Sequence, residues 1–304
     1  MSFRVLGVGE VLWDLLPTGA QPGGAPANFA CHARALGADA GIVTRVGDDA
    51  LGRDILLRFE VLGLPTSLVQ VDGSAPTGTV GVELDAEGVP RFTIHGGAAW
   101  DLLLATGGAL AAATAADAVC FGSLGQRGEP ARSSIQTLVA ATPPRALRIF
   151  DVNLRQPFYS REVLEQSLRL ANVLKLNDTE LPVLASLFGA GGSPEAQLEG
   201  LARRFDLRLA ALTRGPQGSL LLGPTGWADH PGLTAEVVDT VGAGDAFTAA
   251  LALGLLLEWP LDRINALANE VACHVCGCPG ATPSLPLRLA GAFASTSPNS
   301  EVGR

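Results

Sequence analysis

Short apolar runs alternate with helix-like segments along most of this chain, and this alternation is the strongest constraint on its fold. Residues 3–8 and 41–46 predict strands, and residues 27–36 and 49–62 predict the helices that follow them. Further strands are predicted at residues 118–122, 147–152, 173–176 and 208–213. Strands that alternate with helices form a parallel sheet covered on both faces. The sequence therefore predicts an α/β fold with three layers, helices on either side of a mostly parallel sheet.

One segment departs from this alternation. Residues 77–84 and 89–94 alternate apolar and polar side chains in twos around the sequence Asp-Ala-Glu-Gly, which is typical of a β-hairpin. Insertions in an α/β domain often carry function, so we expect the hairpin to form a lid over a site at the strand ends. An edge hairpin without a function is the alternative.

Length and composition favour a globular enzyme. The 304 residues are 47% hydrophobic and 17% charged, which is typical of a packed core. We expect a single domain over residues 1–294, with lid elements near 10–22 and 75–97, and a frayed tail over 295–304. A net charge of −9 disfavours nucleic acid and anionic membranes as partners.

The sequence also predicts a cytoplasmic location. The longest apolar stretch, residues 246–257, is shorter than the roughly 20 residues that a membrane span requires. Glu10 and Asp14 interrupt the apolar region that a signal peptide would need. The five cysteines are odd in number and unevenly spaced, which favours reduced thiols.

The cysteine-rich segment Cys-His-Val-Cys-Gly-Cys at residues 273–278 contains a CxxC pair. A structural zinc site needs four convergent ligands, and no second CxxC pair is present to supply them. Because the segment continues a helical pattern from Leu261, small buried thiols are favoured over a metal site.

A glycine loop precedes the apolar helix that begins near Ala246. Gly242 and Gly244 leave backbone N–H groups unpaired at a helix N-terminus, where the helix dipole favours phosphate. Asp245 lies in the first turn, so we expect the dipole to lower its pKa. Beside a bound phosphoryl group, such a carboxylate is suited to accept a proton from an attacking hydroxyl. The alternative is that Asp245 only caps the helix.

The amino-acid sequence excludes two common nucleotide-binding motifs. A Walker A loop requires Gly-Lys-Ser/Thr, and the only lysine in the chain is Lys175. A dinucleotide fingerprint requires a third glycine, but Phe247 and Leu12 occupy that position after the two candidate glycine pairs. The loop must therefore belong to another kind of phosphate site.

Two segments closely resemble the signatures of the PfkB, or ribokinase-like, carbohydrate kinases. Asp-Thr-Val-Gly-Ala-Gly-Asp-Ala-Phe at residues 239–247 resembles the second signature, and Gly-Gly-Ala-Pro-Ala-Asn at residues 23–28 resembles the first. Similar blocks extend over nearly the whole chain, at residues 9–14, 45–49, 151–155, 177–180, 213–215 and 279–281. The resemblance implies a ribokinase-like fold with a small β-sheet lid, and an ATP-dependent kinase that acts on a sugar hydroxyl.

The resemblance also implies roles for individual residues. Asp245 would be the catalytic base, and the amides of the loop would form the anion hole (Gly242, Ala243 and Gly244). The sugar would be bound by polar side chains and a close backbone approach (Asp14, Gly24, Asn28 and Arg155). The nucleotide would contact a third set (Lys175, Thr213, Gly215, Gly218, Asn269 and Cys273).

Two cation sites follow from the same resemblance. Asn177 and Glu180 would hold Mg²⁺ through water, although this pair is also typical of a helix cap. Asp239 and the carbonyl of Val241 correspond to a monovalent-cation site, which leaves K⁺ open as a further cofactor. The resemblance also leaves open a homodimer formed through the lid, whose exposed edge would need cover.

The loop at residues 23–28 and the block Asp-Val-Asn-Leu-Arg at 151–155 resemble the fructokinase branch, so fructose is the favoured substrate. Arg155 keeps a second substrate open, because in 2-keto-3-deoxygluconate kinases an arginine here meets a sugar-acid carboxylate. A nucleoside kinase and a sugar-binding regulatory protein without catalysis are the remaining alternatives; the intact Asp245 disfavours the latter.

Overall fold

A computed structural model of the chain describes residues 2–16, 19–84, 90–155, 157–234 and 236–293. Its centre is a nine-stranded sheet in the order β13-β12-β11-β10-β9-β8-β1-β4-β5. All neighbours pair in parallel except β11 with β12 and β12 with β13. In chain order the strands are β1 (Arg4–Val8), β4 (Asp39–Gly47), β5 (Val69–Asp72), β8 (Ala118–Phe121), β9 (Leu147–Asp151), β10 (Val173–Asn177), β11 (Leu209–Thr213), β12 (Ser219–Gly223) and β13 (Gly226–His230).

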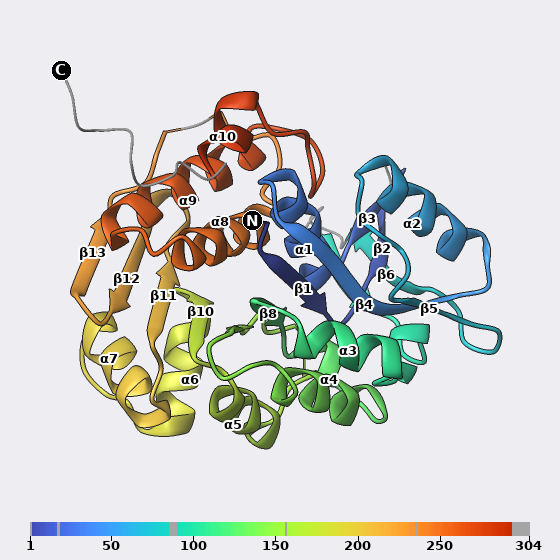
Figure 1. Cartoon of the computed structure of the whole chain (residues 1–304), viewed down its shortest axis with the longest axis horizontal. Coiled ribbons are helices and arrows are strands. Elements are labelled where there is room, and N and C mark those ends of the chain that lie inside the picture. Colours follow the sequence, from blue (N-terminus) through green and yellow to red (C-terminus); the bar gives the residue numbers. More distant parts are fainter. Residues whose placement is uncertain (1, 17–18, 85–89, 156, 235, 294–304) are drawn as a thin grey trace.

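Helices cover both faces of this sheet (Figure 1). One face carries α1 (Ala25–Ala35), α2 (Ala50–Val61), α8 (Ala243–Leu256), α9 (Leu261–Cys276) and α10 (Leu287–Ala292). The other carries α3 (Gly107–Thr114), α4 (Ala131–Ala140), α5 (Arg161–Leu170), α6 (Glu180–Phe188) and α7 (Pro194–Phe205). The predicted three-layer α/β/α architecture is therefore confirmed.

Successive side chains of each strand enter opposite layers of the core. In β9, Ile149 packs with the layer of α1, α8 and α9, whereas Phe150 packs with the layer of α3 to α7. Both side chains are fully buried. This explains why the strands are continuous apolar runs rather than alternating ones, since a parallel sheet covered on both faces has no solvent side.

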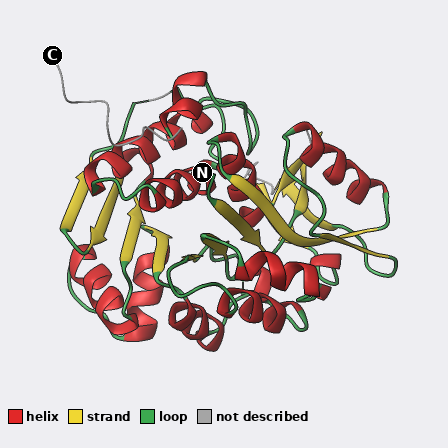
Figure 2. Ribbon diagram, viewed as in Figure 1, coloured by secondary structure: helices red, strands yellow, loops and turns green. Residues whose placement is uncertain are grey.

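The predicted hairpin is present as β6 (Gly78–Leu84) and β7 (Pro90–Ile94), which pair antiparallel. It joins β2 (Leu12–Leu16) and β3 (Gly19–Gly23) in a second sheet of order β3-β2-β6-β7. This small sheet lies beside α2, at one end of the main sheet (Figures 1 and 2). A separate apolar cluster that includes Leu12, Val80 and Trp100 anchors it.

Some predicted boundaries shift. The helix expected from residue 246 begins at Ala243. Strands β5, β12 and β13 were not predicted. The expected frayed tail, residues 295–304, lies outside the described residues. Over the described ranges, none of the helices combines the length and the apolar character needed to cross a membrane.

Candidate active site

The N-terminus of α8 is shaped by a close backbone contact. Gly242 caps the helix with φ of 80°, and a β-carbon at this position would lie 2.2 Å from the carbonyl oxygen of Ala281. Only glycine fits such a conformation and such a contact. In the described part of the chain the amides of Gly242 and Gly244 have no acceptor, while the Ala243 amide donates to Thr240 O at 3.3 Å. Two of the three predicted anion-hole amides are thus free.

Asp245 occupies the first turn of α8 and is held from a second helix. The Nδ2 atom of Asn28, on α1, donates to its Oδ2 atom at 2.9 Å. Burial, and next the charge of Asp151, raise the pKa of Asp245 to about 6, although Asn28 and Lys175 oppose the rise. The expectation that the helix dipole would lower this pKa is therefore wrong, because desolvation outweighs the dipole in this enclosed position.

Lys175 lies in the middle of β10 and lines the site. Its Nζ atom is 3.0 Å from Oδ1 of Asp151, and both side chains are almost completely buried. Burial alone would lower the pKa of Lys175, but the carboxylates of Asp151, Glu180 and Asp245 raise it above its ordinary value. A β-carbon at Gly244 would lie 3.0 Å from the same Nζ atom. The ammonium group therefore lies directly beneath the glycine loop.

Three of the four predicted sugar-binding residues come from the small sheet and from the start of α1, and Arg155 comes from the segment after β9. Asp14 is on β2, and Gly24 caps α1 with φ of 110°. Burial raises the pKa of Asp14, and the positive charge of Arg155 opposes this. Arg155 lowers the pKa of Asp245 in the same way. Arg155 and Asp245, from separate parts of the sequence, line one cavity.

A cavity of about 690 Å³ opens beside the glycine loop. Its walls come from the C-terminal ends of β10 and β11, from α8 and from α9. The lining includes every residue predicted to contact the nucleotide (Lys175, Thr213, Gly215, Gly218, Asn269 and Cys273). It also includes residues of the other predicted sets: two of the anion hole, the base, the Mg²⁺ pair and one of the sugar set (Ala243, Gly244, Asp245, Asn177, Glu180 and Arg155).

Asn177 and Glu180 form the helix cap that was the alternative to metal binding. Oδ1 of Asn177 accepts from the Glu180 amide at 2.9 Å, and Oε2 of Glu180 accepts from the Asn177 amide at 2.8 Å. Oε1 of Glu180 accepts from the Leu154 amide. In the described part of the chain, no group of three or more His, Cys, Asp or Glu side chains is placed to hold a metal ion. The Mg²⁺ assignment stays a prediction.

Asn269 belongs to a buried network as well as to the cavity wall. Its Nδ2 atom donates to Ser219 Oγ at 2.7 Å and to Asn265 O at 2.8 Å. Gly218 has φ of 77°, and a β-carbon there would lie 2.0 Å from His230 O. These contacts fix the wall of the cavity between β12, β13 and α9.

The predicted monovalent-cation pair lies on the segment before α8. Oδ1 of Asp239 accepts from the Val241 amide at 3.0 Å, and Oδ2 accepts from the Gly280 amide at 3.1 Å. The carboxylate thus joins this segment to the loop at residues 279–282. Its role in cation binding stays a prediction.

Sequence reasoning missed two carboxylates. Asp151 ends β9 and accepts from Thr248 Oγ1 of α8 at 3.0 Å, so it links the sheet to the helix that carries Asp245. Glu10 follows β1 and is 1% exposed, and its carboxylate oxygens have no partner in the described structure. Burial raises the pKa of Glu10 to about 7. Both residues lie in the family-like blocks, which is the signal that could have found them.

Two free amides at the start of α8, a carboxylate in the same turn and an adjacent cavity are the groups that a phosphotransferase with a hydroxyl acceptor requires. Residues 18–288 match the pfkB family carbohydrate kinase. The protein belongs to this family.

Known proteins agree with this assignment over nearly the whole chain. A fructokinase of Klebsiella pneumoniae is 32% identical over 95% of this chain and 98% of its own. An uncharacterized sugar kinase of Pyrococcus horikoshii, solved in complex with ATP, superposes with a TM-score of 0.79 at 27% identity, covering 95% of this chain and 99% of its own. A Vibrio cholerae fructokinase solved with fructose, ADP and a calcium ion superposes with a TM-score of 0.76 at 26% identity, covering 96% of this chain and 99% of its own. The chain is a sugar kinase with a ribokinase-like fold.

The buried carboxyl of Glu10 generates a prediction for stability. Its pKa rises from 4.5 to about 7, so the protonated form is favoured in the folded state. The contribution of the Glu10 carboxyl to the free energy of unfolding, about 3 kcal/mol, is therefore fully present below pH 4.5 and is lost as the pH rises through 7. We expect the gain in free energy of unfolding from Glu10→Gln, relative to the native protein, to be larger at pH 8 than at pH 4.5. Denaturant unfolding of both proteins at the two pH values measures this.

The exposed Glu199 of α7 offers the matched control, Glu199→Gln. A gain from Glu10→Gln that is the same at both pH values would show that the native carboxyl is not held protonated.

The cysteines generate a prediction for the cavity. Cys273 and Cys276 line it, and burial raises the pKa of Cys276, which slows alkylation of that thiol. The described lining does not include Cys278. We expect ATP to slow the reaction of Cys273 with N-ethylmaleimide and to leave that of Cys278 unchanged, as measured by peptide mass spectrometry. Equal protection of both thiols would contradict the placement of the nucleotide.

Proposed function

We propose that this protein phosphorylates fructose with ATP. The observation that supports this most directly is the placement of Asp245 beside the free amides of Gly242 and Gly244 and in a hydrogen bond with Asn28. The carboxylate thus follows the predicted anion hole directly along the chain and contacts a residue of the predicted sugar loop. Relatives named fructokinase at about 30% identity favour fructose among sugars.

Asp245 would act as the general base. Its pKa of about 6 leaves it ionised at neutral pH, and it is more basic there than an ordinary aspartate. The sugar hydroxyl would give its proton to this carboxylate as its oxygen attacks the γ-phosphate. The amides of Gly242 and Gly244, together with the amide of Ala243, would stabilise the charge on the transferred group.

The cavity beside the glycine loop suits a nucleotide, since it lies at the C-terminal ends of parallel strands, where α/β folds bind ligands. Thr213, Gly215 and Gly218 would face the phosphates and ribose, and Asn269 with Cys273 the adenine. Lys175 would place a positive charge beneath the phosphates.

The cap formed by Asn177 and Glu180 fits a Mg²⁺ ion held through water. Each Glu180 oxygen accepts one backbone hydrogen bond and can accept another, from a water of the ion's hydration shell. When bound, the ion would neutralise charge on the nucleotide phosphates. The segment with Asp239 and Val241 would take a monovalent cation.

The sugar would lie between Asp14, Gly24 and Asn28 on one side and Asp245 on the other. We propose that the small sheet closes over it, which would exclude water that the base could otherwise activate for ATP hydrolysis. The same sheet is the surface through which a dimer would form.

A 2-keto-3-deoxygluconate kinase is the second candidate. The charge of Arg155 acts on both Asp14 and Asp245, and Arg155 lines the same cavity as Asp245. A guanidinium there is suited to a sugar-acid carboxylate.

The substrate is tested by ATP consumption with separate sugars: fructose, 2-keto-3-deoxygluconate, ribose, fructose 6-phosphate and a nucleoside. We expect fructose to give the highest kcat/KM. Preference for the sugar acid would assign Arg155 to its carboxylate. Absence of turnover with every acceptor would overturn the kinase proposal and favour a sugar-binding protein.

The base is tested by substitution and by pH. Asp245→Asn should lower kcat about 100-fold or more, since it removes the proton acceptor and keeps the shape of the side chain. Asp262→Asn, on the exposed face of α9, is the matched control. Near-normal turnover by Asp245→Asn would contradict the assignment.

The native enzyme should lose kcat/KM for the sugar as the pH falls below about 6, because the base becomes protonated. The pH dependence of kcat/KM measures this. The fall of kcat/KM at acidic pH should persist in Glu10→Gln. If the fall disappears in this variant, the titrating group is Glu10 instead of Asp245.

A further inference from the structure

His32 is a buried side chain to which the proposed reaction gives no role. It lies on α1, one helical turn after Asn28, and is 1% exposed. Its Nε2 atom lies 2.9 Å from the carbonyl oxygen of Ala281. Burial lowers the pKa of His32 to about 4, so the ring is neutral at neutral pH. Because a carbonyl oxygen only accepts, Nε2 carries the proton and donates it to this bond.

The residue that His32 holds is the one that packs on the anion hole. A β-carbon at Gly242 would lie 2.2 Å from Ala281 O and 2.7 Å from Ala281 Cα. The two backbones are therefore in direct contact, and a shift of Ala281 would move Gly242 and the amides that follow it. Protein interiors are close-packed, so such a shift would be transmitted across the contact rather than absorbed.

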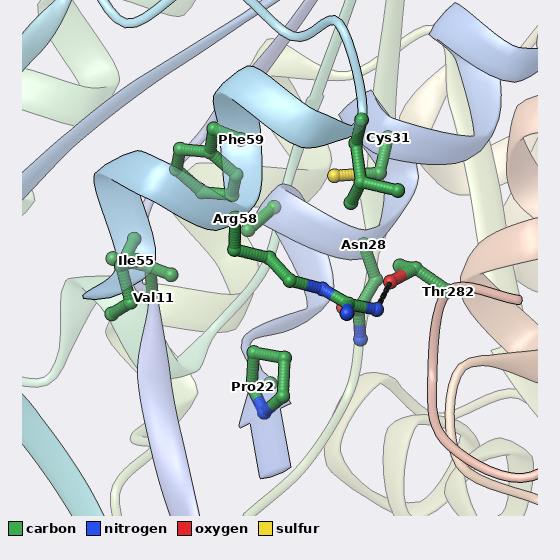
Figure 3. A pocket seen from close by; sticks show the side chains of 11 residues that line it. Val11, Pro22, Asn28, Cys31, Ile55, Arg58, Phe59 and Thr282 are labelled. Carbon is green, nitrogen blue, oxygen red and sulfur yellow. Dashed lines mark hydrogen bonds between the residues drawn. The ribbon is translucent and has the colours of Figure 1, made fainter. Parts of the chain in front are cut away.

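The loop around Ala281 is held at three points. On one side, the Gly280 amide donates to Asp239 at 3.1 Å. On the other, Arg58 of α2 donates to Thr282 Oγ1 at 3.2 Å, across a small pocket lined by Asn28 and Cys31 (Figure 3). Between them, His32 holds the carbonyl group that meets Gly242.

Helix α1 thus acts on both parts of the proposed catalytic centre. Asn28 donates to the carboxylate of Asp245, and His32 donates to the carbonyl that supports Gly242. Side chains four residues apart lie on the same face of a helix. The spacing places the base and the anion hole in a fixed relation to a single rigid element.

We propose that His32 is a positioning residue for phosphoryl transfer: its hydrogen bond to Ala281 O keeps the loop at residues 280–282 against Gly242 and so fixes the amides of the anion hole. This inference rests on the proposed kinase reaction. It assigns to His32 no contact with sugar or nucleotide.

Two variants separate the hydrogen bond from the packing. His32→Leu fills much of the same space without a donor, and His32→Gln keeps an N–H group at a similar reach. We expect His32→Leu to lower kcat by about tenfold with little change in either KM, because misplaced amides weaken binding of the transition state more than of the substrates. His32→Gln should recover most of kcat.

The matched control is His274→Leu. His274 of α9 also approaches a carbonyl, that of Ser284, at 3.0 Å, but this bond lies three residues beyond the contact with Gly242. We expect it to leave kcat unchanged. Equal loss of kcat in His32→Leu and His274→Leu would overturn the inference, as would an unchanged kcat in His32→Leu.

A second measurement does not depend on turnover. Amide hydrogen exchange of the peptide that spans residues 238–247 should be faster in His32→Leu than in the native protein and near native in His32→Gln. If the native protein phosphorylates no acceptor, the proposed function fails, and exchange alone decides whether His32 orders the loop. If the native protein is active and both exchange and kcat are unaffected, the inference fails while the function stands. Should His32→Leu not fold, His32→Asn, whose shorter amide does not reach the carbonyl, replaces it.

Discussion

The candidate site depends on one buried ammonium group among three carboxylates. Lys175 pairs with Asp151 at 3.0 Å, and the charges of Glu180 and Asp245 also raise its pKa. Several carboxylates enclosed together would repel one another and take up protons. The single lysine of the chain offsets this repulsion at the point where β9, β10 and α8 meet. Its removal would leave buried charges without a partner, which costs far more than the loss of an exposed ion pair.

This arrangement explains why the pKa of Asp245 lies near 6. Burial and the neighbouring Asp151 raise it, and Asn28 and Lys175 hold it below the value that burial alone would give. A base with this pKa is ionised at neutral pH yet still takes a proton readily. The free amides of Gly242 and Gly244, with the ammonium group of Lys175 beside the loop, then favour a phosphoryl group next to a negative charge. The amides that attract a phosphoryl group and the carboxylate that repels it thus lie within one turn of α8.

The sequence could predict the parts of this site that lie close together along the chain. The glycine loop before α8 and the apolar strands are local patterns, and the three-layer fold follows from them. The pKa of Asp245 was predicted in the wrong direction because two causes of the rise are not local in the sequence: the burial of the carboxylate, and the charge of Asp151, which is 94 residues away. Strands β12 and β13 were missed for a related reason: they are short, and their antiparallel pairing interrupts the βα alternation. The burial of Glu10 and the contact of His32 with Ala281 arise from tertiary packing, which no spacing in the sequence reveals.

Helix α1 connects the choice of sugar to the chemistry. Gly24 begins the helix in a conformation that glycine adopts readily, Asn28 reaches Asp245, and His32 reaches the loop behind Gly242. A sugar that contacts the start of this helix therefore acts on the element that positions the base. Because eight consecutive residues of the helix are buried, we expect it to move as a rigid body. Changes in the loop at residues 23–28 that alter sugar preference should therefore alter kcat as well as KM, since binding and positioning share one rigid body.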